Sequence, residues 1–352
     1  MEERQELNER CKAVLAEVIY DYIATAEPVG SVTIAKKHFE HLSAATIRNV
    51  MSELEDMGFL DQPHTSAGRK PTDKGYRYFV DEILRSGDCL ERDPPVFPQV
   101  YGQNVKDLNG VLETACGILS KTSNQTGLVM RPSFSCMLFK HIEFIKTGKY
   151  EILAVFTPDM GTTQSKIIPV DENINQEKLT FFSNYLNREF SNKSIKWIRK
   201  EVARRIQSEK EHYTQLMNKA MELCTKTFTE SDNTSDLLVD GALNFFDQPE
   251  FSLDIEKIKA LLKAVEEKTK LVKLLDLCLG HDGMTILIGK ENGDEEMREC
   301  SLIAQNYLMG DEKIGTVAIF GSKRMDYGKM INIVDSTAKT ISQLLSERKK
   351  RS

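Results

Sequence analysis

Two groups of side chains in the first quarter of the sequence have the chemical types and the spacing to bind nucleic acid. Thr46, Arg48 and Asn49 lie close together in the run AATIRNVMSELEDMG. An asparagine can pair bidentately with adenine and an arginine with guanine, so these side chains could read base edges. The segment 64–80 contains four cations and a single acid, and the cations could hold phosphates: Arg69, Lys70, Lys74 and Arg77.

Three amphipathic helices are predicted to position the first group. Apolar residues recur at intervals of three and four over 7–24, which indicates the first helix. Ser31 is a suitable N-cap for a short second helix over 32–38. Ser43 can cap a third helix that ends at Gly58, and the apolar stripe of this helix is Ile47, Val50, Met51 and Leu54.

These helices and the segment after them have the pattern of a winged helix-turn-helix. In that arrangement the second of two closely joined helices enters the major groove, where its first residues read bases. Ser43 and Ala44 begin this helix, so backbone N–H groups there could hold a phosphate. The run FLDQPHTSAGRKPT predicts a β-turn-β wing with Arg69 and Lys70 at the exit of its turn, followed by a helix through Leu84. The same pattern also fits a protein-interaction domain, which would show no salt-dependent affinity for DNA.

The overall charge gives no support to nucleic-acid binding. The net charge of the chain is −6, and residues 1–85 contain 11 Lys and Arg against 15 Asp and Glu, a difference of −4. A chain that binds DNA through its phosphates commonly has a basic domain. The case for DNA therefore depends on where individual cations lie.

Composition predicts neither an enzyme nor a metalloprotein nor a membrane protein. The motifs GxSxG, GxxxxGK[ST], HExxH and GxGxxG are all absent, and no cofactor is expected. The seven cysteines include no CxxC pair, and the six histidines have no metal-ligand spacing. No apolar run approaches the roughly 18–20 residues of a membrane span, and the charged start is unlike a signal peptide. We expect a cytoplasmic protein with reduced thiols.

The rest of the chain alternates between strand and helix patterns. A proline-containing linker over 86–104 precedes a predicted helix over 105–121. Residues 175–279 are helical in pattern throughout, and a last helix is expected over 326–346. Strands are predicted on both sides of this helical block, at 126–130, 139–145, 150–156, 162–170, 284–291, 301–308 and 314–321. A sheet interrupted in this way indicates one domain inserted into another.

Several runs closely resemble the HrcA family of heat-inducible transcription repressors. They are PVGSVTIAK, LSAATIRNVMSELEDMGFL and QPHTSAGRKPTDKGYRYFVD, with GTVAIFGSKRMDYGKMINIVD near the C-terminus. The resemblance implies a repressor that binds CIRCE, an inverted-repeat operator, upstream of groE- and dnaK-type chaperone operons. It also implies the chaperonin GroEL as a modulator. A homodimer would match the two-fold symmetry of an inverted repeat.

The resemblance implies an α+β architecture with three parts. They are a winged helix-turn-helix over 1–85, a GAF-like antiparallel-sheet domain and a mostly helical dimerisation domain inserted into it. The pattern of strands and helices assigns 105–174 and 266–347 to the GAF-like domain and 175–265 to the insert. An alternative function is a ligand-sensing regulator whose GAF-like pocket controls DNA release. The sequence identifies no polar residues for such a pocket, so a structural role of this domain is preferred.

Two positions depart from the family pattern. Val32 stands where relatives often have a basic residue, so a phosphate contact at the start of the second helix is expected to be absent. Such a loss would weaken affinity without changing sequence preference. Ser322 stands where proline is usual, a mild change in a turn.

Overall fold

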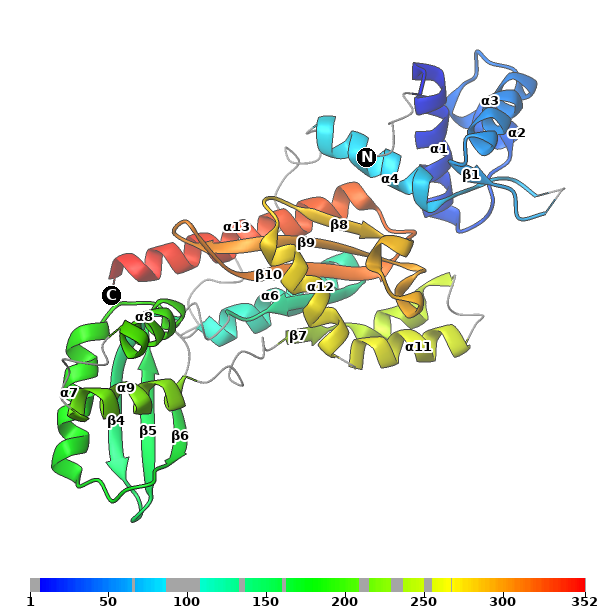
Figure 1. Ribbon diagram of the computed structural model, residues 1–352. Coiled ribbons are helices and arrows are strands. Elements are labelled where there is room, and N and C mark those ends of the chain that lie inside the picture. Colours follow the sequence, from blue (N-terminus) through cyan, green and yellow to red (C-terminus); the bar gives the residue numbers. More distant parts are fainter. Residues whose placement is uncertain are drawn as a thin grey trace. The chain divides into compact units, whose positions relative to one another are not determined.

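The structure, a computed structural model, combines helices with antiparallel sheets, so the α+β class is confirmed (Figure 1). It describes residues 7–64, 67–86, 108–132, 137–159, 163–208, 215–228, 237–249, 255–266 and 268–351. The chain forms two compact units. Unit 1 comprises 1–102, 113–129 and 237–352, and unit 2 comprises 103–112 and 130–236.

Three helices begin unit 1, as the sequence predicts. They are α1 (Glu9–Thr25), α2 (Ser31–His38) and α3 (Ala44–Asp56). Asn8 caps α1 by accepting the N–H of Cys11 at 2.8 Å. The predicted cap of α2 is wrong by one residue, because Gly30 is the N-cap and Ser31 is already helical. The apolar stripes of the three helices meet in one core that includes Val14, Val18, Ile34, Ile47, Met51 and Leu54.

A short antiparallel ribbon and a fourth helix follow. The strand β1 (Leu60–Asp61) pairs with β2 (Lys70–Pro71), and α4 (Asp73–Ser86) begins two residues later. The predicted turn between the strands includes Thr65 and Ser66, which lie outside the described residues. The ribbon is anchored to the connection between α1 and α2, because Val29 and Arg69 exchange two backbone hydrogen bonds of 2.9 Å.

A five-stranded sheet forms the centre of unit 1, in the order β7-β3-β10-β9-β8. Its strands are β3 (Thr126–Met130), β7 (Leu237–Asp240), β8 (Thr285–Ile288), β9 (Cys300–Met309) and β10 (Glu312–Ser322). The sheet contacts α13 (Tyr327–Arg351) and α12 (Lys268–Gly280), and α6 (Leu108–Ser123) and α11 (Ile255–Glu266) complete the helices of this region. The predicted strand at 284–291 is too long, because Gly289 has a φ of +56° and begins the 3-10 helix η4 (Gly289–Asn292).

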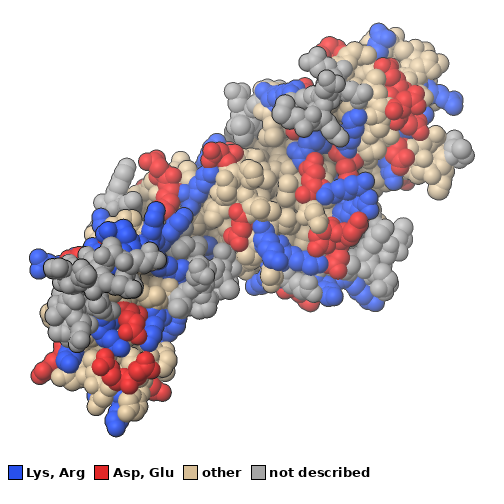
Figure 2. Space-filling view, viewed as in Figure 1, with Lys and Arg blue, Asp and Glu red and all other residues tan. Residues whose placement is uncertain are grey.

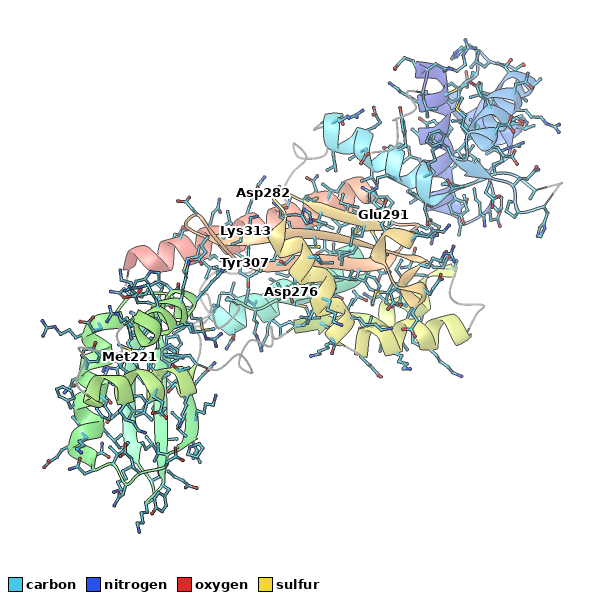
Figure 3. The ribbon with its side chains drawn as sticks, in the orientation of Figure 1. Met221, Asp276, Asp282, Glu291, Tyr307 and Lys313 are labelled. Atoms are coloured by element: carbon cyan, nitrogen blue, oxygen red, sulfur yellow. The ribbon has the colours of Figure 1, made fainter. Side chains whose placement is uncertain are left out.

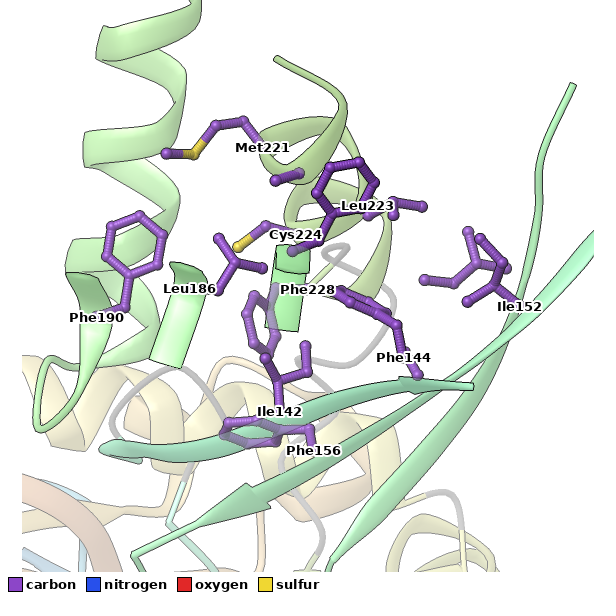
Figure 4. Close-up of a cluster of buried hydrophobic side chains, with 14 of the residues drawn as sticks. Ile142, Phe144, Ile152, Phe156, Leu186, Phe190, Met221, Leu223, Cys224 and Phe228 are labelled. Carbon is purple, nitrogen blue, oxygen red and sulfur yellow. The ribbon is translucent and has the colours of Figure 1, made fainter. Parts of the chain in front are cut away.

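Unit 2 contains a separate three-stranded sheet in the order β4-β5-β6. Its strands are β4 (Phe139–Lys146), β5 (Glu151–Pro158) and β6 (Gln164–Pro169), and its helices are α7 (Gln176–Phe190), α8 (Ile195–Ser208) and α9 (Gln215–Thr227). Alternate residues of the strands pack against the helices in one buried cluster, which includes Ile142, Phe144, Phe156, Leu186, Phe190, Cys224 and Phe228 (Figure 4). This cluster is a complete core within unit 2.

The division of the strands between two sheets differs from the expectation. The sequence pattern predicts that all strands before residue 174 belong to the same domain as the C-terminal strands, but of these only β3 joins them. Because β4 has a fully apolar inner side formed by Phe139, Ile142 and Phe144, it packs on the helices that follow it in the chain. The block 175–279 is also not helical throughout, since β7 and the 3-10 helix η3 (Ala242–Asp247) lie within it.

No helix in the described part of the chain is long and apolar enough to cross a membrane. The predicted linker lies outside the described residues from 87 to 104, as do Cys89 and Cys136. The last helix extends to Arg351, five residues beyond its predicted end.

Candidate nucleic-acid interface

The N-terminus of α3 is fixed by a side-chain cap. Ser43 Oγ accepts the backbone N–H of Thr46 at 3.0 Å and lies 2.9 Å from Thr46 Oγ1. This confirms the predicted cap, and it shows that the Thr46 hydroxyl is already in a hydrogen bond. Ser43 is exposed and Ala44 is half-buried, so an anion could reach the first turn of the helix.

Replacing Ser43 by alanine is expected to destabilise α3 by about 1 kcal/mol, because the Thr46 N–H loses its acceptor. Hydrogen exchange of the α3 amides in the full chain would measure the loss. Ser52→Ala on the same helix is the matched control, since the Ser52 hydroxyl caps nothing among the described residues. Equal exchange in the two variants would contradict the capping role of Ser43.

Two of the predicted base-reading side chains are exposed on a helix whose opposite side is buried. Arg48 and Asn49 are adjacent and exposed on α3. On the opposite side of the helix, Ile47, Met51 and Leu54 are fully buried and hold it against α1 and α2. Within the described residues, neither the Arg48 nor the Asn49 side chain has a hydrogen bond or an ion pair. They are therefore available to a ligand without breaking an existing contact.

The two cations of the ribbon differ in how firmly they are held. Arg69 makes two contacts of 2.8 Å with the Glu55 carboxylate, one through Nε and one through a terminal nitrogen, and its side chain is only 13% exposed. It ties the ribbon to α3. Lys70 is opposite Asp61 in the β1–β2 register, with 3.7 Å between the charged atoms and 41% of its side chain exposed. Such an exposed pair is weak, so Lys70 can reach a phosphate.

Lys74 and Arg77 on α4 already have intramolecular partners. Lys74 Nζ donates to the Met57 carbonyl at 2.8 Å and lies 4.4 Å from the centre of the Phe59 ring. Lys74 therefore stabilises the C-terminal end of α3.

Arg77 is occupied by the sheet region of unit 1. It donates to both carboxylate oxygens of Glu291 and to the Ile286 carbonyl (Figure 3 labels Glu291 beside the five-stranded sheet). Burial alone would lower the pKa of Arg77, but the hydrogen bonds and the charge of Glu291 outweigh it and raise the pKa. Arg77 is thus engaged in intramolecular hydrogen bonds, and we do not include it among the proposed DNA contacts.

A further exposed cation, not predicted as a DNA contact, lies on α2. Lys36 is exposed in the last turn of α2, which packs on α3, and it has no partner among the described residues. The neighbouring Lys37 is 3.2 Å from Asp21. Val32 is 53% exposed on the same helix, so a longer basic side chain at that position would reach solvent.

The surface around these residues carries both signs of charge. Figure 2 shows acidic and basic side chains interspersed over the N-terminal helices, with no broad positive area on the side that it displays. This agrees with the net charge of −4 over residues 1–85 that follows from the sequence. Binding to DNA would therefore depend on a few well-placed donors more than on the long-range field.

The described residues contain no cluster of metal ligands and no exposed cysteine. No three His, Cys, Asp or Glu side chains in the described residues lie together as a metal site. Cys11, Cys116, Cys224, Cys278 and Cys300 are buried. Burial raises the pKa of Cys116 and of Cys224 to about 12, so both are protonated thiols near neutral pH.

Comparison with known proteins places this chain beside transcription repressors. Residues 109–331 match the family model described as the HrcA protein C-terminal domain. The heat-inducible transcription repressor HrcA of Geobacter sulfurreducens is 41% identical over 342 residues, which cover 97% of this chain and 98% of that protein. The repressor of the same name from Syntrophobacter fumaroxidans is 36% identical over 343 residues, with the same coverage. A crystal structure described as a hypothetical protein has the same overall fold, with a TM-score of 0.63, 24% identity, and coverage of 97% of this chain and 99% of the other.

Proposed function

Because this chain belongs to the HrcA family of heat-inducible transcription repressors, we propose that it represses chaperone operons of the groE and dnaK type by binding an inverted-repeat operator. The observation in the structure that carries this proposal is the pair of exposed donors, Arg48 and Asn49, on a capped and well-packed helix. Repression needs only reversible binding that blocks the polymerase, so the protein needs no catalytic group.

In the proposed arrangement, residues 7–86 are a winged helix-turn-helix. The recognition helix is α3, and the ribbon β1–β2 is the base of the wing. Arg48 and Asn49 contact base edges, and Thr46 can join them by exchanging its bond to Ser43. The N–H groups at Ser43 and Ala44 and the Lys70 ammonium hold phosphates, while Arg69 positions the wing through Glu55.

The two units suggest a refined domain layout. The five-stranded sheet with its helices is the GAF-like domain, and unit 2 is the inserted dimerisation domain. The insert would then run from about residue 130 to 236, in place of the expected 175–265. A homodimer would present two copies of α3 to the two half-sites of an inverted repeat.

The signal for release would come from the chaperone system. When unfolded protein occupies GroEL, less chaperonin is free to modulate the repressor, and DNA is released. Membership of a family of heat-inducible repressors supports this part of the proposal, and we propose that the protein acts in the cytoplasm, where its DNA lies.

A footprint combined with transcription in vitro tests the proposal. Hydroxyl-radical cleavage of a CIRCE-type operator should show protection in both half-sites, related by two-fold symmetry. The same protein concentration should reduce transcription from a promoter that carries the operator and leave a promoter without it unaffected. Equal transcription from the two promoters would overturn the proposal.

Lys70→Ala is expected to weaken binding to operator and random duplex by the same factor, because a phosphate contact carries no sequence information. The dependence of log affinity on log salt concentration should become less steep by roughly one unit. Lys313→Ala removes an equal charge from the ion pair with Asp282 in the sheet region and is expected to change neither quantity. A loss confined to the operator would instead assign Lys70 to base recognition.

A further inference from the structure

Two distinctive sequence runs from opposite ends of the chain contact one another inside unit 1. The run DKGYRYF forms the first half of α4, and the run GSKRMDY joins β10 to α13. The element η4, after β8, completes the contact. Both runs belong to segments that resemble the family, but the proposed DNA contacts use neither Arg77 nor any residue of GSKRMDY.

The first connection is between Arg77 and Glu291. The guanidinium donates through Nε and one terminal nitrogen to the two carboxylate oxygens, so the pair is bidentate, and it also donates to the Ile286 carbonyl at 2.6 Å. Glu291 in turn accepts the backbone N–H of Ile288 at 2.9 Å. A bidentate pair whose two partners each make a further hydrogen bond fixes the orientation of the guanidinium relative to the carboxylate as well as the distance between them.

The second connection is centred on Asp73, at the start of α4. Its carboxylate accepts from Lys323 Nζ at 2.8 Å and from the backbone N–H of Lys290 at 3.2 Å. The contact at Gly289 is so close that a Cβ there would lie 2.3 Å from the Asp73 carboxylate. The Lys323 side chain is only 19% exposed, so solvent screens the pair with Asp73 weakly.

The third connection reaches α1 and adds an apolar contact. Arg324 donates to the carbonyl of Ile23, near the end of α1. The rings of Tyr76 and Tyr327 are both buried, with 5.7 Å between their centres. Tyr327 is held in place by hydrogen bonds to Ser301 and to the Lys323 carbonyl. Three separate points of α1 and α4 are thus attached to the sheet region.

We propose that these contacts, which we call the α4 clamp (Asp73, Arg77, Glu291, Lys323 and Arg324), hold α3 in one orientation and so make the dimer selective for one separation of operator half-sites. The inference rests on the proposed function, since it requires a dimer and an inverted repeat. Its residues are positioning residues that do not touch DNA. Partly buried ion pairs suit this role, because such a pair can specify geometry even where it adds little net stability.

The clamp predicts how affinity depends on spacing. The native protein should bind an inverted repeat of the natural spacing and lose affinity when the spacer is changed by about half a helical turn, roughly 5 base pairs. In Arg77→Gln and Glu291→Gln, α3 can reorient, so the ratio of affinities between the two spacings should fall by about three- to thirtyfold. Affinity for a duplex with a single half-site should stay at the native value.

The matched control is Arg85→Gln. Arg85 lies on the same helix, and its one ion pair among the described residues is with Glu82 at 2.7 Å. This variant therefore loses an equal charge without touching the clamp and should keep the native spacing ratio. Glu291→Gln retains an oxygen for the Ile288 N–H, which makes it the milder clamp variant. If the clamp variants keep the native ratio, or lose affinity equally at every spacing, the inference is wrong.

A second measurement does not depend on DNA binding. Two spin labels, at the exposed positions Val32 and Glu312, report the distance between α2 and the sheet region. The doubly labelled chain is diluted with unlabelled chain, so that distances within one chain are measured. The distribution should be narrow in the native protein and in Arg85→Gln, and broad in both clamp variants. Narrow distance distributions in the clamp variants would overturn the inference, whether or not the protein binds the operator. If the native protein does not prefer the inverted repeat, the proposed function is wrong. A broadened distance distribution in the clamp variants would still show that the clamp fixes the orientation of the N-terminal helices.

Discussion

Arg48→Ala is expected to weaken operator binding by about 1–3 kcal/mol and to leave binding to random duplex nearly unchanged. Arg48 is exposed on α3 and has no intramolecular partner among the described residues, so its removal should not disturb the fold. Anisotropy titrations of the two duplexes at one salt concentration measure the difference.

Arg298→Ala provides the matched loss of charge for that experiment. Arg298 pairs with Glu295 at 3.2 Å in the sheet region, away from α3 in the sequence, and its removal should change neither affinity. A loss by the same factor on operator and random DNA would assign Arg48 to a phosphate and remove the main proposed base contact.

Gly75→Ala is expected to destabilise the N-terminal helices by about 3 kcal/mol or more and to abolish operator binding. A Cβ at this position would lie 2.3 Å from the backbone oxygen of Phe59, so α4 could not remain against the strand that follows α3. The clash is between the Cβ itself and a main-chain oxygen, so no side-chain rotation relieves it. Urea unfolding followed by hydrogen exchange of the α1–α4 amides measures the effect.

The control for this variant is Gly280→Ala at the end of α12, where a new Cβ meets nothing within 4 Å. It should leave stability unchanged or raise it slightly, because alanine favours helix over glycine. Similar unfolding midpoints for Gly75→Ala and Gly280→Ala would show that α4 tolerates displacement from Phe59.

The elements of the N-terminal segment could be predicted because their signals are local. The spacing of Ile47, Met51 and Leu54 fixes the buried side of α3, and with it the exposure of Arg48 and Asn49. Ser43 lies three residues before the N–H group that it caps, so its role depends only on neighbours in the sequence. The choice of candidate base contacts follows from these local relations.

Contacts between distant segments could not be predicted in the same way. Arg77 has the sequence context of a phosphate-binding cation, but its partner Glu291 is 214 residues away. The division of the strands into two sheets has the same origin, since alternation along β4 defines which side is buried without identifying the helices that cover it. The resemblance to a family identified both runs of the clamp as distinctive, and only the structure places them in contact.

The measurement that tests the central claim most directly is an anisotropy titration of the purified protein at several salt concentrations. It compares a CIRCE-type inverted repeat with a scrambled duplex of equal length. We predict tight binding to the repeat, weaker binding to the scrambled duplex, and a loss of affinity on both as salt rises. Equal or absent binding to the two duplexes, with GroEL present as well as without it, would contradict the assignment of α3 as a recognition helix for this operator.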